Sequence, residues 1–218
     1  MKNIAVIARK GGSGKTTVAV NLAIAAYRRG YTVEVADTDP QGSTFEVLKA
    51  RKIEGPTVVQ TTGAELHAAR NQPSLGLGLR VLDTPAGSED AVGHAIALAQ
   101  VSLLVVRPTF LDLAATLQTA LILRRLRRPG LILLNQAPVP RGGVEPPAVK
   151  RALDALRLMQ LPVLPVMLRA RAAYQTSLAL GCSVEEMGGD GRAAEEIAAL
   201  WSYLERFALG ASRSTEAA

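Results

Sequence analysis

Short apolar runs alternate along the chain with stretches in which apolar residues recur at helical spacing. The first run, Ile4–Ala8, precedes a glycine-rich turn and the helical pattern of Thr17–Arg29. Further strands are predicted at Tyr31–Ala36, Val58–Thr61, Leu79–Leu82, Ser102–Val106, Leu131–Leu134 and Val163–Leu168. Helices are predicted between most of them, at 43–51, 88–98, 112–127, 146–159 and 172–180, and a last helix is predicted near 191–208.

This alternation predicts an α/β fold, with a mostly parallel, twisted sheet and helices on both of its faces. The chain has no internal repeat and no linker that divides it, so residues 1–210 are expected to form a single domain. Residues 211–218 are expected to be a flexible tail. Ala137–Pro147, which contains four prolines and two glycines, should be a second flexible segment.

Composition narrows the class of protein. Hydrophobic residues make up 48% of the chain and aromatic residues only 4%, so a core of mainly aliphatic side chains is expected. No apolar run approaches the roughly 20 residues that cross a bilayer, and the first predicted strand leaves no room for a signal peptide. A cytoplasmic protein without stable membrane insertion is expected. The single cysteine, Cys182, excludes an internal disulfide and a cysteine-rich metal centre.

The net charge of +6 is unevenly distributed. Residues 121–175 contain ten lysines and arginines but only two acidic residues. A basic surface suits a polyanion such as DNA. A solvated face with scattered arginines fits the same composition equally well.

The most specific motif, RKGGSGKTT at residues 9–17, lies between the first predicted strand and the first predicted helix. Glycines let successive backbone N–H groups turn toward phosphate oxygens, and the N-terminus of the following helix adds the positive end of its dipole. In such a loop Lys15 neutralises the β- and γ-phosphates of ATP, and the Thr16 hydroxyl binds Mg²⁺. The remaining expected phosphate contacts come from Gly11, Gly12, Ser13, Gly14 and Thr17.

The segment Lys10–Thr16 resembles the signature of the ParA/MinD family of P-loop ATPases, which carry a deviant Walker A motif. The usual motif would have a glycine where this chain has Arg9. The resemblance implies a homodimer that forms on ATP binding, in which Lys10 reaches the nucleotide of the partner subunit. A second cation there would stabilise charge that develops during phosphoryl transfer.

Two acidic segments are similar to further motifs of this family. Asp37–Ser43 resembles its D-x-D-P-Q segment, which implies that Asp39 positions the attacking water and that Asp37 lies near the Mg²⁺ shell. The same segment also fits an Asx-type turn that caps the following helix. Asp83 ends a hydrophobic strand as a Walker B acid does, which implies a contact with Mg²⁺ through water. Catalytic roles are thus implied for Lys10, Lys15 and Asp39, and metal roles for Thr16, Asp37 and Asp83.

The C-terminal half adds less specific signals. Asn135 matches the position at which the family places an asparagine against adenine, although a polar strand end is an equally simple interpretation. No guanine-reading N-K-x-D motif follows it, so ATP is favoured over GTP. Residues 168–187 resemble small partition ATPases, which implies that Arg169 and Arg171 bind DNA without sequence specificity. Arg124–Arg128 is a second candidate, or simply a basic helix end that complements the helix dipole.

The leading functional hypothesis is an ATP-dependent switch for DNA partition or intracellular positioning. Its ATP dimer would associate with the nucleoid, and a ParB-like or other partner would stimulate slow hydrolysis. A metabolic ligase similar to dethiobiotin synthetase and a MinD-like ATPase at the membrane surface are the alternatives. A reductase similar to the nitrogenase iron protein would need cluster-binding cysteines that the chain lacks.

Overall fold

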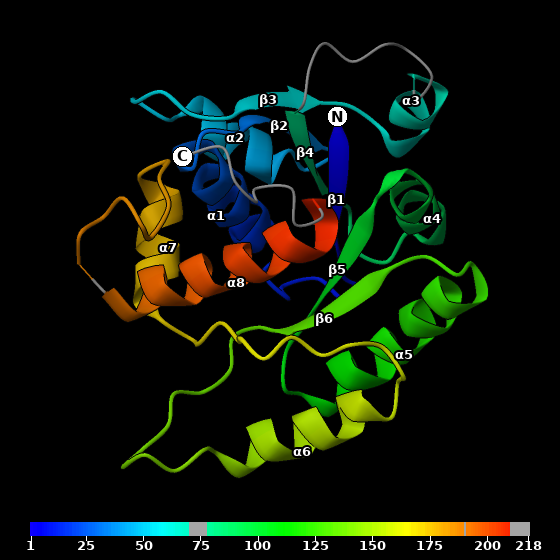
Figure 1. Ribbon diagram of the computed structural model, residues 1–218, viewed down its shortest axis with the longest axis vertical. Helices are drawn as coiled ribbons and strands as arrows, with labels where there is room; N and C mark the ends of the chain where they lie inside the picture. The colour runs from blue at the N-terminus through cyan, green and yellow to red at the C-terminus, as the bar shows by residue number, and fades with distance from the viewer. Residues whose placement is uncertain (70–77, 190, 210–218) are drawn as a thin grey trace, which may run out of the picture.

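The computed structural model describes residues 1–69, 78–189 and 191–209, and the expected tail at 211–218 lies outside them. Six strands form one parallel sheet in the order β3-β2-β4-β1-β5-β6, with helices on both faces (Figure 1). The predicted fold class is therefore confirmed. In parallel α/β sheets, ligands bind outside the carboxyl ends of the strands, where the strand order reverses.

The strands are β1 (Lys2–Ile7), β2 (Thr32–Asp37), β3 (Thr57–Gln60), β4 (Gly78–Asp83), β5 (Val101–Val106) and β6 (Gly130–Leu134). The helices are α1 (Lys15–Arg28), α2 (Ser43–Lys49), α3 (Gly63–Ala68), α4 (Glu89–Leu98), α5 (Phe110–Arg125), α6 (Pro147–Arg157), α7 (Ala172–Ala179) and α8 (Gly191–Leu209).

Side chains that alternate along the strands build two hydrophobic layers. Ile4 and Val6 of β1 pack on the face covered by α1, α7 and α8, whereas Ala5 and Ile7 pack on the face covered by α4, α5 and α6. Helix α1 is apolar on most of its surface because it lies between the sheet and α8 (Figure 1). The start of α1 is thereby fixed at the carboxyl end of β1, where the glycine-rich loop lies.

One prediction of secondary structure was wrong, and one helix was missed. Val163–Leu168 forms no strand; isolated parallel bridges join Val163 to Ile132 and Arg169 to Ala137 instead. Pro162 and Pro165 explain this, because a residue without an N–H group cannot donate to a continuous ladder. Helix α3 was not predicted, although its capping box, in which Thr62 and Glu65 each accept from the other's backbone N–H, was readable in the sequence.

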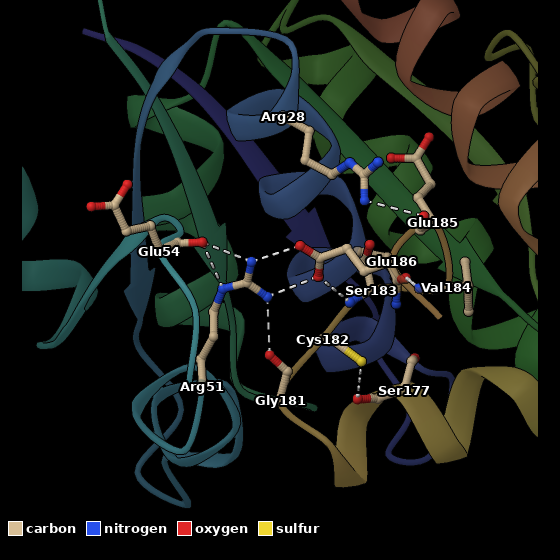
Figure 2. A network of polar contacts seen from close by, with 11 residues as sticks. Arg28, Arg51, Glu54, Ser177, Gly181, Cys182, Ser183, Val184, Glu185 and Glu186 are labelled. Carbon is tan, nitrogen blue, oxygen red and sulfur yellow. Dashed lines mark hydrogen bonds and ion pairs between the residues drawn. The ribbon is translucent and has the colours of Figure 1, made fainter. Parts of the chain in front are cut away.

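A buried ion pair ties the end of α2 to the loop at 181–186. The guanidinium of Arg51 donates to both carboxylate oxygens of Glu186, at 2.8 and 2.6 Å, and to the carbonyl oxygen of Gly181 (Figure 2). The two charged side chains are only 4% and 10% exposed. Burial raises the pKa of Glu186, but the hydrogen bonds from Arg51 and from the Ser183 N–H outweigh it, so the pKa is lowered.

We expect Arg51→Met to lower the free energy of unfolding by about 3–5 kcal/mol, because it would leave the Glu186 carboxylate buried without its cation. The matched control is Arg157→Met, since Arg157 pairs with Asp154 where both side chains are 71% exposed. That change should alter stability by less than about 1 kcal/mol. Guanidinium unfolding of both variants is the measurement, and equal losses would contradict the structural role of the Arg51 pair.

Candidate functional site

The glycine-rich loop turns from the end of β1 into α1 at the carboxyl edge of the sheet. Gly12 and Gly14 have φ angles of 73° and 91°, in the region that only glycine enters easily. A side chain at Gly14 would also collide with the amide of Asn135. Gly14 caps α1 without any side-chain hydrogen bond, so the first N–H groups of the helix are available to an anion.

Lys15, at the start of α1, is 8% exposed, and its ammonium group has no hydrogen bond or ion pair with any described residue. The charge of Lys15 interacts with that of Asp83, but the two side chains form no ion pair, so an anionic ligand would complete the compensation of the lysine. The start of α1 and the adjoining end of the loop supply backbone N–H groups beside the same lysine. This combination suits the phosphates of a nucleotide.

Asp83 and Asp37 end the neighbouring strands β4 and β2 and lie opposite one another in the ladder. Oδ2 of Asp83 accepts hydrogen bonds from the hydroxyls of Thr16, at 2.9 Å, and Thr44, at 2.6 Å. Oδ1 is buried and has no partner among the described residues. Burial, aided by the charge of Asp37, raises the pKa of Asp83 to about 6 despite the hydrogen bonds from the two threonines.

An unpartnered carboxylate oxygen beside a threonine hydroxyl fits Mg²⁺, a hard cation that takes oxygen ligands and retains several waters. The hydroxyl of Thr16 lies within hydrogen-bond distance of Asp83, so the metal roles predicted for these two residues are compatible with the structure. Within residues 1–69, 78–189 and 191–209, no three His, Cys, Asp or Glu side chains could hold a metal together. A cation here would therefore depend on phosphate and water for most of its shell.

Asp37 lies close to this centre, but its carboxylate is engaged with the backbone. Its two oxygens accept hydrogen bonds from the N–H groups of Asp39, at 3.1 Å, and Phe45, at 2.9 Å. An Asx-type turn is therefore present, and Asp37 accepts from the first turn of α2, although the N-cap residue Gly42 has no side-chain cap. Burial raises the pKa of Asp37, and these backbone hydrogen bonds oppose that effect. A contact between Asp37 and the magnesium shell stays a prediction.

The two residues expected to act on the γ-phosphate lie on the rim of the loop region. Lys10 is half-buried, and its side chain has no hydrogen bond or ion pair with any described residue. Its neighbour Arg9 is instead paired with Glu89 at 2.6 Å. The carboxylate of Asp39 accepts from the N–H of Gln41 at 3.0 Å. The roles of Lys10 and Asp39 stay predictions, since the nucleotide, water and partner subunit on which they would act lie outside this chain.

The remaining predicted site residues have partners within the protein. Asn135 is buried and donates from Nδ2 to the carbonyl oxygen of Ser13 at 2.6 Å, so it supports the loop; its contact with adenine stays a prediction. Arg169 is paired in a bidentate manner with Glu145, and Arg171 with Glu196. The arginine side chains are 13% and 15% exposed, so neither charge is presented freely to DNA.

Sequence reasoning missed several residues of the site. Thr44 holds Asp83 from the first turn of α2, and Arg107 and Gln136 touch the outer side of the glycine-rich loop. These residues belong to no local motif. Arg107 follows the end of β5 and Gln136 lies just beyond the end of β6, and the sheet brings both strand ends to the loop although they are distant from it in the sequence. No helix in the described part of the chain is long and apolar enough to cross a bilayer.

Comparisons with known proteins agree with this geometry. A model of the CobQ/CobB/MinD/ParA nucleotide-binding domain matches residues 4–200. The maintenance of carboxysome distribution protein A of Halothiobacillus neapolitanus is 32% identical over 209 residues, which cover 89% of this chain and 92% of that protein.

Solved structures share the fold. A complex of Cyanothece McdA with ATP superposes with a TM-score of 0.78 at 15% identity and covers 99% of each chain. The septum site-determining protein MinD of Pyrococcus horikoshii, bound to Mg-ADP, has a TM-score of 0.76 at 18% identity and covers 97% of this chain and 99% of that chain.

The raised pKa of Asp83 predicts a pH dependence of stability in the nucleotide-free protein with EDTA. The folded-state pKa, about 6, lies above the ordinary value of 3.8, so the folded protein binds the proton more tightly. The contribution of this group to the free energy of unfolding should therefore decrease as pH rises from about 4 to 6, by on the order of 3 kcal/mol.

Asp83→Asn isolates this effect, since the amide does not ionise and its oxygen still accepts from the two threonines. Urea unfolding at several pH values should show the variant gaining stability relative to wild type as pH rises through this window. A constant difference between the two proteins from pH 4 to 7 would contradict the assignment.

Proposed function

The chain belongs to the CobQ/CobB/MinD/ParA family of nucleotide-binding domains, and from this membership we propose that it is an ATP-driven switch that positions a cargo inside the cell. ATP and Mg²⁺ bind at the glycine-rich loop, two subunits close over two nucleotides, and hydrolysis separates them. The observation that carries this proposal is the arrangement at the loop, where Lys15 forms no ion pair or hydrogen bond with a described residue and the buried Oδ1 atom of Asp83 has no hydrogen-bond partner among them.

Separate groups of the protein bind the phosphates, bind Mg²⁺ and act at the γ-phosphate. Lys15 and the backbone of residues 11–17 hold the phosphates, and the Thr16 hydroxyl and Asp83, through water, hold Mg²⁺. When bound, Mg²⁺ neutralises part of the phosphate charge. Asp39 orients a water for attack on the γ-phosphate, and the partner's Lys10 stabilises the charge that develops there.

Two surface features support the dimer. The side chain of Lys10 has no partner among the described residues, which suits a group that acts on a neighbouring subunit. Phe110 and Leu111, at the start of α5, are 81% and 62% exposed. They follow closely after Arg107, whose guanidinium touches the loop. Large apolar side chains exposed beside a binding site favour an interface.

Nonspecific DNA binding by the ATP dimer is the second part of the proposal. The arginines at the end of α5 suit it better than Arg169 and Arg171, because Arg124, Arg125 and Arg127 are exposed and have no ion pair with described residues. Contacts with phosphates need little exact geometry and release counterions, so they weaken steeply with salt. Arg169 and Arg171 could contribute only if their pairs with glutamates opened in the dimer.

The cargo is proposed from the similarity to the carboxysome distribution protein. A large protein assembly, carried over the nucleoid by a partner that stimulates hydrolysis, fits this similarity best. A plasmid or chromosome with a ParB-like partner remains the other cargo of the same mechanism, and a partial match of 55 residues to the chromosome-partitioning ATPase Soj of Thermus thermophilus is in line with it. In both cases the protein is nucleoid-associated while it holds ATP.

Two lysine variants separate the steps of this cycle. Lys15→Ala should abolish binding of ATP, because the buried cation for the phosphates is lost. Lys10→Ala should bind ATP within about threefold of wild-type affinity, yet remain a monomer in gel filtration with light scattering, because its role lies in the partner's site. Wild type with Mg-ATP should form a dimer that DNA retains at low salt, and with Mg-ADP it should do neither.

Arg157→Ala serves as the control for loss of one exposed positive charge, since Arg157 and its partner Asp154 are both 71% exposed. It should dimerise as wild type does. A wild-type protein that stays monomeric at saturating Mg-ATP, or a Lys10→Ala variant that dimerises normally, would contradict the proposed cycle.

A further inference from the structure

Three side chains hold the outer side of the glycine-rich loop at three successive carbonyl groups. A guanidinium N–H of Arg107 points at the oxygen of Gly11 at 3.5 Å, and Gln136 Nε2 donates to that of Gly12 at 2.9 Å. Asn135 Nδ2 donates to the oxygen of Ser13 at 2.6 Å. We refer to Arg107, Asn135 and Gln136 as the carbonyl clamp.

Peptide planarity gives these contacts a consequence on the inner side of the loop. In a trans peptide the C=O of one residue and the N–H of the next point in opposite directions. Holding the carbonyl groups of residues 11–13 outward therefore turns the N–H groups of residues 12–14 inward. Those are donors that a phosphate-binding loop needs. The clamp thus fixes the binding conformation of the loop through its carbonyl groups.

The backbone around Gln136 is held in a strained conformation that serves this contact. Gln136 has a φ of 51°, which is uncommon for any residue other than glycine and is unfavourable by about 1 kcal/mol or more. The hydrogen bonds of its neighbours impose it, because the Asn135 N–H donates to Val106 and the Ala137 N–H to Leu168. A side-chain donor on a strained strand end, aimed at the loop, points to a role in the site.

The orientation of Arg107 is also fixed by hydrogen bonds. Its guanidinium donates to both carboxylate oxygens of Asp112, at 3.0 and 3.2 Å, and Asp112 is 3% exposed in the first turn of α5. The Thr109 hydroxyl also donates to that carboxylate. Arg107 therefore reaches the loop from a position fixed by the start of α5, which connects the loop to the exposed Phe110 and Leu111.

We propose that the carbonyl clamp presets the glycine-rich loop before nucleotide arrives, and that its three members are positioning residues for nucleotide binding. A loop that is already ordered loses less conformational freedom when the ligand binds, so affinity rises without a new ligand contact. The effect on ATP affinity rests on the proposed function. The ordering of the free loop does not, and it is measurable in the absence of any ligand.

Gln136 is the residue to change, because Arg107→Ala would leave the buried Asp112 without its cation and Asn135 fills a buried space. Gln136→Gly removes the amide and suits the positive φ, so the protein should fold at least as stably as wild type. Gln136→Glu keeps the shape but removes the donor. The matched control is Gln160→Glu, since Gln160 is exposed and has a φ of 56° at the end of α6, with no contact to the loop.

The first readout is amide hydrogen exchange of residues 12–14 in the nucleotide-free protein, with millisecond mixing. Both Gln136 variants should exchange about threefold faster or more than wild type, and Gln160→Glu should not change. The second readout is the dissociation constant for a fluorescent ATP analogue with Mg²⁺. It should rise about 3- to 10-fold in the Gln136 variants, as expected for the loss of one hydrogen bond.

The outcomes separate this inference from the proposed function. Unchanged exchange in Gln136→Gly and Gln136→Glu overturns the clamp, whatever the protein binds. Faster exchange with an unchanged dissociation constant overturns its role in affinity. If wild type itself binds no ATP while the variants exchange faster, the proposed ATP switch is contradicted. The role of the clamp in ordering the loop is then still supported.

Discussion

The folded chain holds the charges of Lys15 and Asp83 near enough to interact at the carboxyl edge of its sheet, without an ion pair between the two side chains. Lys15 is 8% exposed at the start of α1, and Oδ1 of Asp83 is buried at the end of β4 with no hydrogen bond to a described residue. A buried polar atom left in this way lowers the stability of the folded protein. Phosphate and a divalent cation would compensate the two together, because one is an anion and the other takes oxygen ligands. Under the proposed function, binding of Mg-ATP relieves this unfavourable energy.

Helix α2 connects this site to the loop at 181–186. Its first turn contacts Asp83 through the Thr44 hydroxyl and Asp37 through the Phe45 N–H. Just beyond its last turn, Arg51 is locked to Glu186 in the loop at 181–186 (Figure 2). These contacts join the phosphate-binding region to the loop at 181–186 through one short helix.

Much of this architecture was readable from local patterns. The glycine-rich loop, the acidic strand ends and the alternation of strands and helices each depend on a few consecutive residues, and the structure agrees with their placement. One error was local: the Val163–Leu168 run has the composition of a strand, but Pro162 and Pro165 reduce it to isolated bridges beside β6. The other errors arose where distant segments decide. Arg169 and Arg171 are basic in the sequence, yet glutamates from other parts of the chain pair with them. Thr44 and the carbonyl clamp meet the site only through the sheet topology.

A crystal structure with Mg²⁺ and a nonhydrolysable ATP analogue is the decisive measurement for the proposed switch. It should show the analogue's phosphates against Lys15, the cation beside Thr16 and Asp83, and a second subunit whose Lys10 reaches the same γ-phosphate. Isolated subunits with Lys10 in solvent would contradict the switch. A nucleotide bound elsewhere, with the ammonium of Lys15 and Oδ1 of Asp83 still unpartnered, would contradict the account of the site itself.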